Sequence, residues 1–192
     1  MKTDIILSGV GGQGILSIAA VIGEAAIKEN LYMKQAETHG MSQRGGDVQS
    51  NLRISDQPIA SDLIGLGSAD LIISLEPMEA LRYLPYLHAD GCVVTNQTPL
   101  INIPDYPNID DVLAEVKKVK NHVIIDVDSI AKEVGSPRVS NIVMLGASLP
   151  FLGIPSSVVE EGIRSIFGRK GEEVVALNLK ALAAGEAAAV KK

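Results

Sequence analysis

We expect a three-layer α/β/α fold, in which helices cover both faces of a mostly parallel sheet. Short apolar runs alternate with helical patterns along residues 1–137, and this order predicts strand–helix–strand units. The chain is 46% hydrophobic but only 3% aromatic, so an aliphatic core fits a sheet buried on both sides. The chain has 192 residues, so we expect residues 1–192 to form a single Rossmann-like domain that ends in helices over 138–192.

The first part of the chain predicts a strand at residues 5–8, a helix at 13–29 and a second strand at 32–36. The helix carries its apolar residues on one stripe. In residues 47–55 apolar and polar residues alternate, which predicts an amphipathic strand with one wet or partner-facing side. We place this strand at or near an edge of the sheet.

The middle of the chain predicts two more buried strands, at residues 70–75 and 92–95, with a helix at 77–87 between them. A helix at 110–120 then precedes a last strand at 122–127. These elements complete the alternation of strands and helices that a parallel sheet requires.

The C-terminal part predicts helices only. Between the strand at 92–95 and the helix at 110–120, residues 97–108 contain three prolines and predict an irregular loop. Residues 141–152 are almost entirely apolar, so we expect them to be buried between the sheet and another helix or subunit. Helices at 157–167 and 172–190 follow, the latter rich in alanine.

The net charge of −6 argues against a nucleic-acid-binding protein. Such proteins bind phosphates with clustered Lys and Arg, and this chain has no basic tract beyond short pairs. No stretch approaches the roughly 18 apolar residues that a membrane span needs, and the first apolar run is too short for a signal peptide. We expect no nucleic acid, no membrane and a cytoplasmic location.

The chain has one cysteine, Cys92, within an apolar run. A single thiol forms no internal disulfide and holds no iron–sulfur cluster or structural zinc by itself. We interpret Cys92 as a small core residue. We find no nucleophile–base pair and no cluster of metal ligands in the sequence, so we assign no catalytic or metal-binding residue to this chain.

Residues 9–14 (GVGGQG) fit the pattern G-x-G-x-x-G between a strand and a helix. Glycines allow a tight turn, and a helix N-terminus presents free N–H groups to an anion. Glu37, near the end of the second strand, could bind a ribose. The motif is compatible with a dinucleotide, with an anion or pantetheine-type ligand, with a partner's active site, or with close packing of the helix alone.

A polar, glycine-rich segment occupies residues 37–47, where a second helix would normally begin. Arg44 could bind a carboxylate or phosphate in bidentate fashion, and His39 could donate to a substrate or partner or only stabilise the loop. Glu76 follows a buried strand, either at the ligand edge of the sheet or as a charge at a helix N-terminus. The candidate ligand- or partner-facing residues are Gly9, Gly11, Gly12, Gln13, Gly14, His39, Met41, Ser42, Gln43, Arg44, Gly45, Gly46 and Glu76.

Residues 9–14 followed by 37–46 (ETHGMSQRGG) resemble the γ-type module of the 2-oxoacid:ferredoxin oxidoreductases, with the indolepyruvate-type members matching most closely. The resemblance continues in later strings and covers most of the chain. Complexes of that family decarboxylate a 2-oxoacid on thiamine diphosphate, pass electrons through iron–sulfur clusters to ferredoxin, and release an acyl-CoA.

The resemblance implies that this chain is the small subunit of such a complex. It further implies that the large catalytic subunit carries thiamine diphosphate, Mg and the [4Fe–4S] clusters, that this chain alone binds no cofactor, and that ferredoxin is reached through the complex. Coenzyme A is the implied co-substrate, with residues 9–14 near its path. Two alternatives remain: a stand-alone NAD- or FAD-binding oxidoreductase, and a non-catalytic structural subunit.

Overall fold

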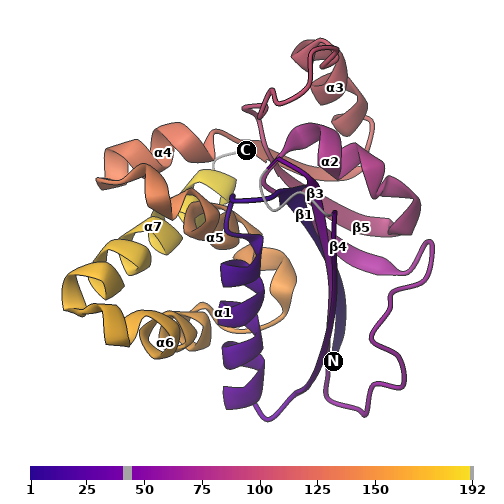
Figure 1. The fold of residues 1–192 in the computed structure, drawn as a ribbon. Helices are drawn as coiled ribbons and strands as arrows, with labels where there is room; N and C mark the ends of the chain where they lie inside the picture. The colour runs from indigo at the N-terminus through magenta and orange to yellow at the C-terminus, as the bar shows by residue number, and fades with distance from the viewer. Residues whose placement is uncertain (41–44, 191–192) are drawn as a thin grey trace.

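The computed structural model describes residues 1–40 and 45–190 and contains a six-stranded sheet with the order β2-β3-β1-β4-β5-β6 (Figure 1). Strands β1, β4, β5 and β6 are parallel, whereas β3 is antiparallel to both of its neighbours. The mostly parallel sheet is therefore confirmed. The strands are β1 (Lys2–Val10), β2 (Tyr32–His39), β3 (Asp47–Ser55), β4 (Ala69–Ser74), β5 (Leu87–Asn96) and β6 (Asn121–Ile125).

Helices cover both faces of the sheet, which confirms the three layers (Figure 1). One face carries α1 (Ile15–Lys28), α4 (Val127–Val134), α5 (Ser140–Leu152), α6 (Ser156–Phe167) and α7 (Glu172–Val190). The other face carries α2 (Pro77–Arg82) and α3 (Ile109–Val116). Short 3-10 turns are η1 (Leu84–Tyr86), η2 (Pro137–Val139) and η3 (Gly168–Lys170). Among the described residues, no helix is both long enough and apolar enough to span a bilayer.

Helix α5 is buried between the sheet and α7, as its apolar sequence predicted. Two glycines let the backbones of α5 and α7 touch. A Cβ atom on Gly146 would lie 2.0 Å from the carbonyl oxygen of Leu182, and one on Gly185 would lie 1.9 Å from that of Val143. Neither position therefore has room for a side chain, because the atoms it would meet belong to the main chain.

Several predicted boundaries are wrong. The helix expected over 110–120 ends at Val116, and the strand expected over 92–95 begins five residues earlier, at Leu87. The helix expected over 77–87 ends at Arg82, and β5 already begins at Leu87. Pro85 explains the early end, since it lacks the N–H that a continuing α-helix needs. The strand expected over 122–127 stops at Ile125, and Val127 instead begins the unpredicted helix α4, whose N-cap Asp126 accepts a hydrogen bond from Ser129 N (2.9 Å).

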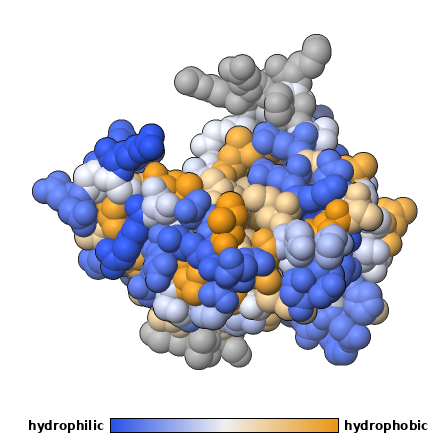
Figure 2. Space-filling view, turned by 90° about the horizontal axis from the view of Figure 1, so that it is seen from below, coloured by the Kyte–Doolittle hydropathy of each residue, from blue (hydrophilic) through white to orange (hydrophobic). Residues whose placement is uncertain are grey.

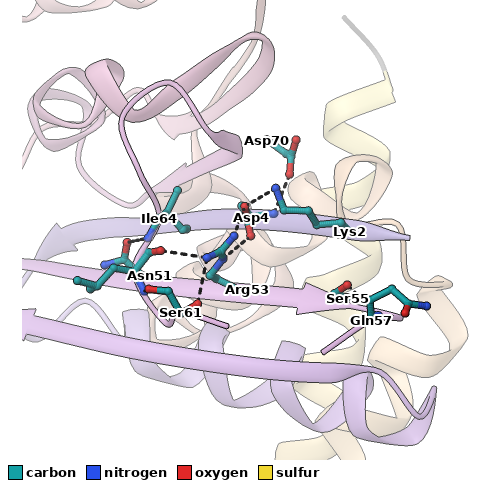
Figure 3. Close-up of polar contacts among 10 residues, drawn as sticks. Lys2, Asp4, Asn51, Arg53, Ser55, Gln57, Ser61, Ile64 and Asp70 are labelled. Carbon is teal, nitrogen blue, oxygen red and sulfur yellow. Dashed lines mark hydrogen bonds and ion pairs between the residues drawn. The ribbon is translucent and has the colours of Figure 1, made fainter. Parts of the chain in front are cut away.

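Strand β3 lies near the edge of the sheet but not at it, because β2 pairs with its outer side. Its polar face is not open to water or a partner along its whole length either. The loop over residues 56–68 covers part of that face (Figure 3). Asn51 is buried and accepts a hydrogen bond from Ile64 N at 3.2 Å. Alternation predicted the polar face correctly, but it does not encode which segment covers that face.

A buried ion pair fixes this loop to the sheet (Figure 3). Asp4 in β1 is only 1% exposed and receives two hydrogen bonds from Arg53, Nε to Oδ1 at 2.8 Å and Nη2 to Oδ2 at 2.9 Å. The third guanidinium nitrogen donates to the carbonyl oxygens of Ser61 and Leu63 in the loop at 3.0 and 3.1 Å. Arg53 therefore joins two strands and a loop. Its two parallel hydrogen bonds to the Asp4 carboxylate have the bidentate geometry that favours arginine over lysine.

Candidate functional site

Residues 9–14, which span the end of β1 and the turn before α1, contain three glycines with positive φ, and at two of them a Cβ would displace a neighbouring side chain. A Cβ on Gly9 (φ 155°) would lie 2.7 Å from Oε1 of Gln13, and one on Gly14 (φ 84°) would lie 2.6 Å from Nδ2 of Asn141. Gly12 differs, because its φ of 101° strains any other residue while a Cβ there would meet nothing within 4 Å. Gly12 therefore leaves the outer surface of the turn open.

Both polar atoms of the Gln13 side-chain amide form hydrogen bonds within the chain. Its Oε1 accepts from Val10 N at 2.7 Å, and its Nε2 donates to Leu75 O at 3.1 Å. The side chain therefore braces the carboxyl end of β1 against that of β4. This bracing role accounts for the amide of Gln13 without a ligand, so its place among the ligand-facing residues stays a prediction.

The two predicted glycine segments meet at the carboxyl end of β1. Gly11 N donates to Gly46 O at 2.8 Å, and the neighbouring Gly45 O accepts a hydrogen bond from Asn102 Nδ2 at 2.5 Å. We call residues 9–14 the first glycine turn. Residues 45–46 are the C-terminal end of the second glycine turn. The predicted residues Met41, Ser42, Gln43 and Arg44 lie outside the described part of the chain, as does the side chain of His39.

Glu76 is 1% exposed and serves as the N-cap of α2, where its carboxylate accepts from Glu79 N at 2.9 Å. Tyr106 in the loop over 97–108 donates its hydroxyl to the same carboxylate. Burial, together with this hydrogen bond, raises the pKa of Tyr106. The structure thus supports the helix-terminal role of Glu76, and a ligand could reach it only if Tyr106 moved away.

The strand order bears on a dinucleotide site. In dinucleotide-binding folds the acidic residue that binds the ribose ends the strand next to β1. Here β3 takes that place, and Glu37 lies on β2, paired with Ser50 of β3. Because adjacent strands lie about 4.8 Å apart, the strand of Glu37 is roughly 10 Å from β1. This arrangement disfavours the stand-alone dinucleotide-binding enzyme.

The first glycine turn also forms one wall of a cavity of about 550 Å³, within the usual size range of ligand sites. Its charged lining residues are Arg138, in η2, and Lys170, at the end of η3; no carboxylate lines it among the described residues. Neither cation forms an ion pair with a described residue, although Lys170 lies over the ring of Phe167. Helix α1 begins at this cavity without a side-chain cap, so its first N–H groups favour an anion.

The same cavity is lined by the buried amides of Asn141 and Asn178. Asn178 donates to Val174 O at 2.7 Å. Sequence reasoning missed Arg138, Lys170 and Asn178, because they come from the C-terminal helical part and carry no motif. A smaller cavity of about 200 Å³ lies at the carboxyl ends of β4 and β5.

The described residues offer no ligand set for a metal or an iron–sulfur cluster. Within residues 1–40 and 45–190, no group of three or more His, Cys, Asp or Glu side chains lies together. Cys92 is buried in the aliphatic core, and burial raises its pKa to about 11. The interpretation of Cys92 as a core residue is confirmed, and the donors present do not fit a cluster.

Comparison with known proteins agrees with this geometry. Residues 4–188 match the family described as pyruvate ferredoxin/flavodoxin oxidoreductase. The indolepyruvate oxidoreductase subunit IorB of Archaeoglobus fulgidus is 39% identical over 96% of this chain and 94% of its own length. A solved keto/oxoacid ferredoxin oxidoreductase γ subunit from Geobacter sulfurreducens is 26% identical, covers 99% of both chains and has a TM-score of 0.72.

The fold recurs within a larger protein. A 2-oxoglutarate:ferredoxin oxidoreductase from Magnetococcus marinus, solved with 2-oxoglutarate, coenzyme A and succinyl-CoA bound, superposes with a TM-score of 0.77 at 23% identity. The match covers all of this chain and 31% of that one. The match over residues 4–188 and the 39% identity to IorB over nearly the whole chain lead to one assignment: the chain belongs to the pyruvate ferredoxin/flavodoxin oxidoreductase family.

Proposed function

We propose that this chain is the small subunit of a 2-oxoacid:ferredoxin oxidoreductase that acts on indolepyruvate or a related aryl pyruvate. The complex would convert one 2-oxoacid and one CoA, with two oxidised ferredoxins, into acyl-CoA, CO₂, a proton and two reduced ferredoxins. The observation that carries the proposal is the hydrogen bond from Gly11 N to Gly46 O, which joins the two glycine segments on which the family resemblance is based. The relatedness to IorB supports the aryl substrate.

The large catalytic subunit is the proposed partner, and it would supply thiamine diphosphate, Mg and the [4Fe–4S] clusters. The placement of the clusters on the partner is supported by the cysteine content, since Cys92 is the chain's only cysteine and is buried. Ferredoxin would receive electrons through the partner's clusters. The complex would work in the cytoplasm, and the isolated small subunit would be inactive.

The small subunit would hold the phosphate-bearing end of CoA. The cavity beside Gly12 and Gly14 combines Arg138, Lys170 and the uncapped start of α1, and these groups together suit a multiply charged anion. The exposed Gly12 would let the backbone approach the ligand closely. The rest of the CoA molecule would extend over the first glycine turn toward the partner's active site.

The test is steady-state kinetics of the co-expressed complex, with indolepyruvate as substrate and ferredoxin as acceptor. Removing a charge-assisted hydrogen bond costs about 1.5–3 kcal/mol, so Arg138→Ser and Lys170→Ser should each raise the KM for CoA roughly tenfold or more. The kcat at saturating CoA should stay close to that of the wild type. Arg169→Ser is the matched control, because Arg169 is an exposed cation of η3 that does not line the cavity.

A structural subunit without a CoA role is the second candidate. It is favoured by the internal hydrogen bonds of Gln13 and by the packing of Gly9 and Gly14. It predicts that Gly12→Ala changes assembly of the complex without changing the KM for CoA. Gly67→Ala is the control, since Gly67 also has positive φ and open space around it but lies in the loop over 56–68. Tight binding of NAD or FAD by the isolated chain would contradict both candidates.

A further inference from the structure

An exposed apolar segment lies beside the two glycine turns. Residues 97–108, which we call the strap, follow β5 and contain Ile101 and Ile103, which are 70% and 41% exposed. Leu16 at the start of α1 is also exposed, at the same end of the sheet. Single exposed apolar residues are common on protein surfaces, so exposure alone does not identify an interface. The way in which the strap is held makes the difference.

The strap has no regular secondary structure, yet hydrogen bonds fix it to the domain at three points. Gln97 N donates to Ile125 O at 2.8 Å, Asn102 Nδ2 donates to Gly45 O at 2.5 Å, and the Tyr106 hydroxyl donates to the buried carboxylate of Glu76. The two isoleucines directly flank the middle anchor, Asn102. They are therefore presented in a defined position, and a partner would not have to order the segment when it binds.

The middle anchor makes the strap continuous with the proposed active-site surface. Asn102 bonds to Gly45, the adjacent Gly46 bonds to Gly11, and Gly11 belongs to the first glycine turn. The three segments therefore lie at the same end of the sheet, where the parallel strands end, at the top of Figure 1. We propose that the strap is a docking surface for the large catalytic subunit, with Ile101 and Ile103 inserted into an apolar depression of that subunit. This inference rests on the proposed function, because it assumes that the glycine turns face the same partner.

The other end of the sheet provides a comparison. Figure 2 shows that end, where apolar patches lie between hydrophilic side chains. Met1, Ile27 and Tyr32 are exposed there, and Leu63 and Leu66 are 62% and 70% exposed on the loop over 56–68. That loop is anchored to the sheet by hydrogen bonds with Arg53 and Asn51, as the strap is anchored by its own hydrogen bonds. Within the described part of the chain, no hydrogen bond connects this loop to the glycine turns, which makes its leucines a matched control.

The experiment measures the dissociation constant between the full-length chain and the large subunit by titration calorimetry. Ile101→Ser/Ile103→Ser should weaken assembly at least tenfold, which corresponds to about 1.4 kcal/mol. Leu63→Ser/Leu66→Ser should change it less than twofold. Asn102→Ala keeps both isoleucines but releases the strap from Gly45, and it should weaken assembly by an intermediate factor. Circular dichroism of each variant verifies that the fold is retained.

The outcomes separate this inference from the proposed function. If the wild-type chain does not bind the large subunit, the proposed function fails and the inference fails with it. If the wild type binds and the strap variant binds equally well, only the inference is overturned. It is also overturned if the leucine variant alone weakens assembly, or if the isoleucine variant only abolishes self-association of this chain in sedimentation velocity. Selective loss in the isoleucine variant supports it.

Discussion

Replacing Gly146 with alanine tests the backbone contact between α5 and α7. The new Cβ would lie 2.0 Å from the carbonyl oxygen of Leu182 and 2.9 Å from its carbonyl carbon. Close carbon–oxygen contacts in proteins are about 3.3–3.6 Å, so the overlap exceeds an ångström. Because the opposing atoms are main chain, no side chain can rotate away, and the helices must separate.

Overpacking of a buried contact costs about 1–3 kcal/mol and occasionally more, and a main-chain clash of this depth belongs at the upper end. The better helix propensity of alanine returns up to about 1 kcal/mol, which leaves a net loss of about 2 kcal/mol. For a chain of this length, each kcal/mol lowers Tm by about 2–4 °C. We therefore expect Gly146→Ala to lower Tm by about 4–8 °C.

The assay is thermal unfolding of the isolated chain, followed by circular dichroism. Gly168→Ala is the control, because Gly168 has ordinary helical dihedral angles (φ −55°) and a Cβ there would meet nothing within 4 Å. It should leave Tm unchanged or raise it slightly. If the Gly146 variant melts within 1 °C of the Gly168 variant, the reasoning about helix contact is refuted.

Three further predictions concern stability and reactivity. Arg53→Met should cost about 3 kcal/mol in urea unfolding, because the buried charge of Asp4 would lose Arg53 and keep Lys2 as its ion-pair partner among the described residues. Lys120→Met breaks an exposed surface pair and should leave the free energy of unfolding close to that of the wild type; equal losses in the two variants would contradict the argument. Cys92, whose pKa is raised to about 11 by burial, should resist iodoacetamide at pH 8 in the native chain and react fully in urea; rapid native labelling would show that the thiol is accessible. Burial raises the pKa of Tyr83 to about 12, and the pKa of Tyr106 is raised as well, so the folded chain keeps protons that the unfolded chain loses above about pH 10. Their contribution to stability is complete below that pH and falls as pH rises further, and Tyr106→Phe should show a shallower loss of unfolding free energy between pH 10 and 11.5 than the wild type.

Local patterns predicted the elements whose signal is long and periodic. The strand–glycine–helix unit at the N-terminus and the apolar helix α5 are confirmed, since each depends on residues close together in the chain. Helix α4 was missed because it has only eight residues and follows β6 with a single intervening residue, Asp126. The position of β3 within the sheet could not be predicted for a different reason. Alternation of apolar and polar residues indicates a polar face, but it does not indicate which strand pairs on each side.

The site was predicted in part. The sequence identified the two glycine segments but not their contact, which is the hydrogen bond from Gly11 N to Gly46 O. The partners of Gln13 and Glu76 could not be predicted, because Leu75 O and the Tyr106 hydroxyl lie 62 and 30 residues away along the chain. Asn102 carried no signal at all, since one asparagine in a proline-rich loop is typical of turns.

The second glycine turn connects β2 to β3, so the pairing of this hairpin determines where the turn lies. Strand β3 is paired with β1 over nine consecutive positions, from Lys2 with Ser55 to Val10 with Asp47. A slip of two residues would keep every side chain on its own face, but it would carry the turn about 7 Å along β1 and break the Gly11–Gly46 bond. The ladder therefore sets the position at which the second glycine turn meets the first.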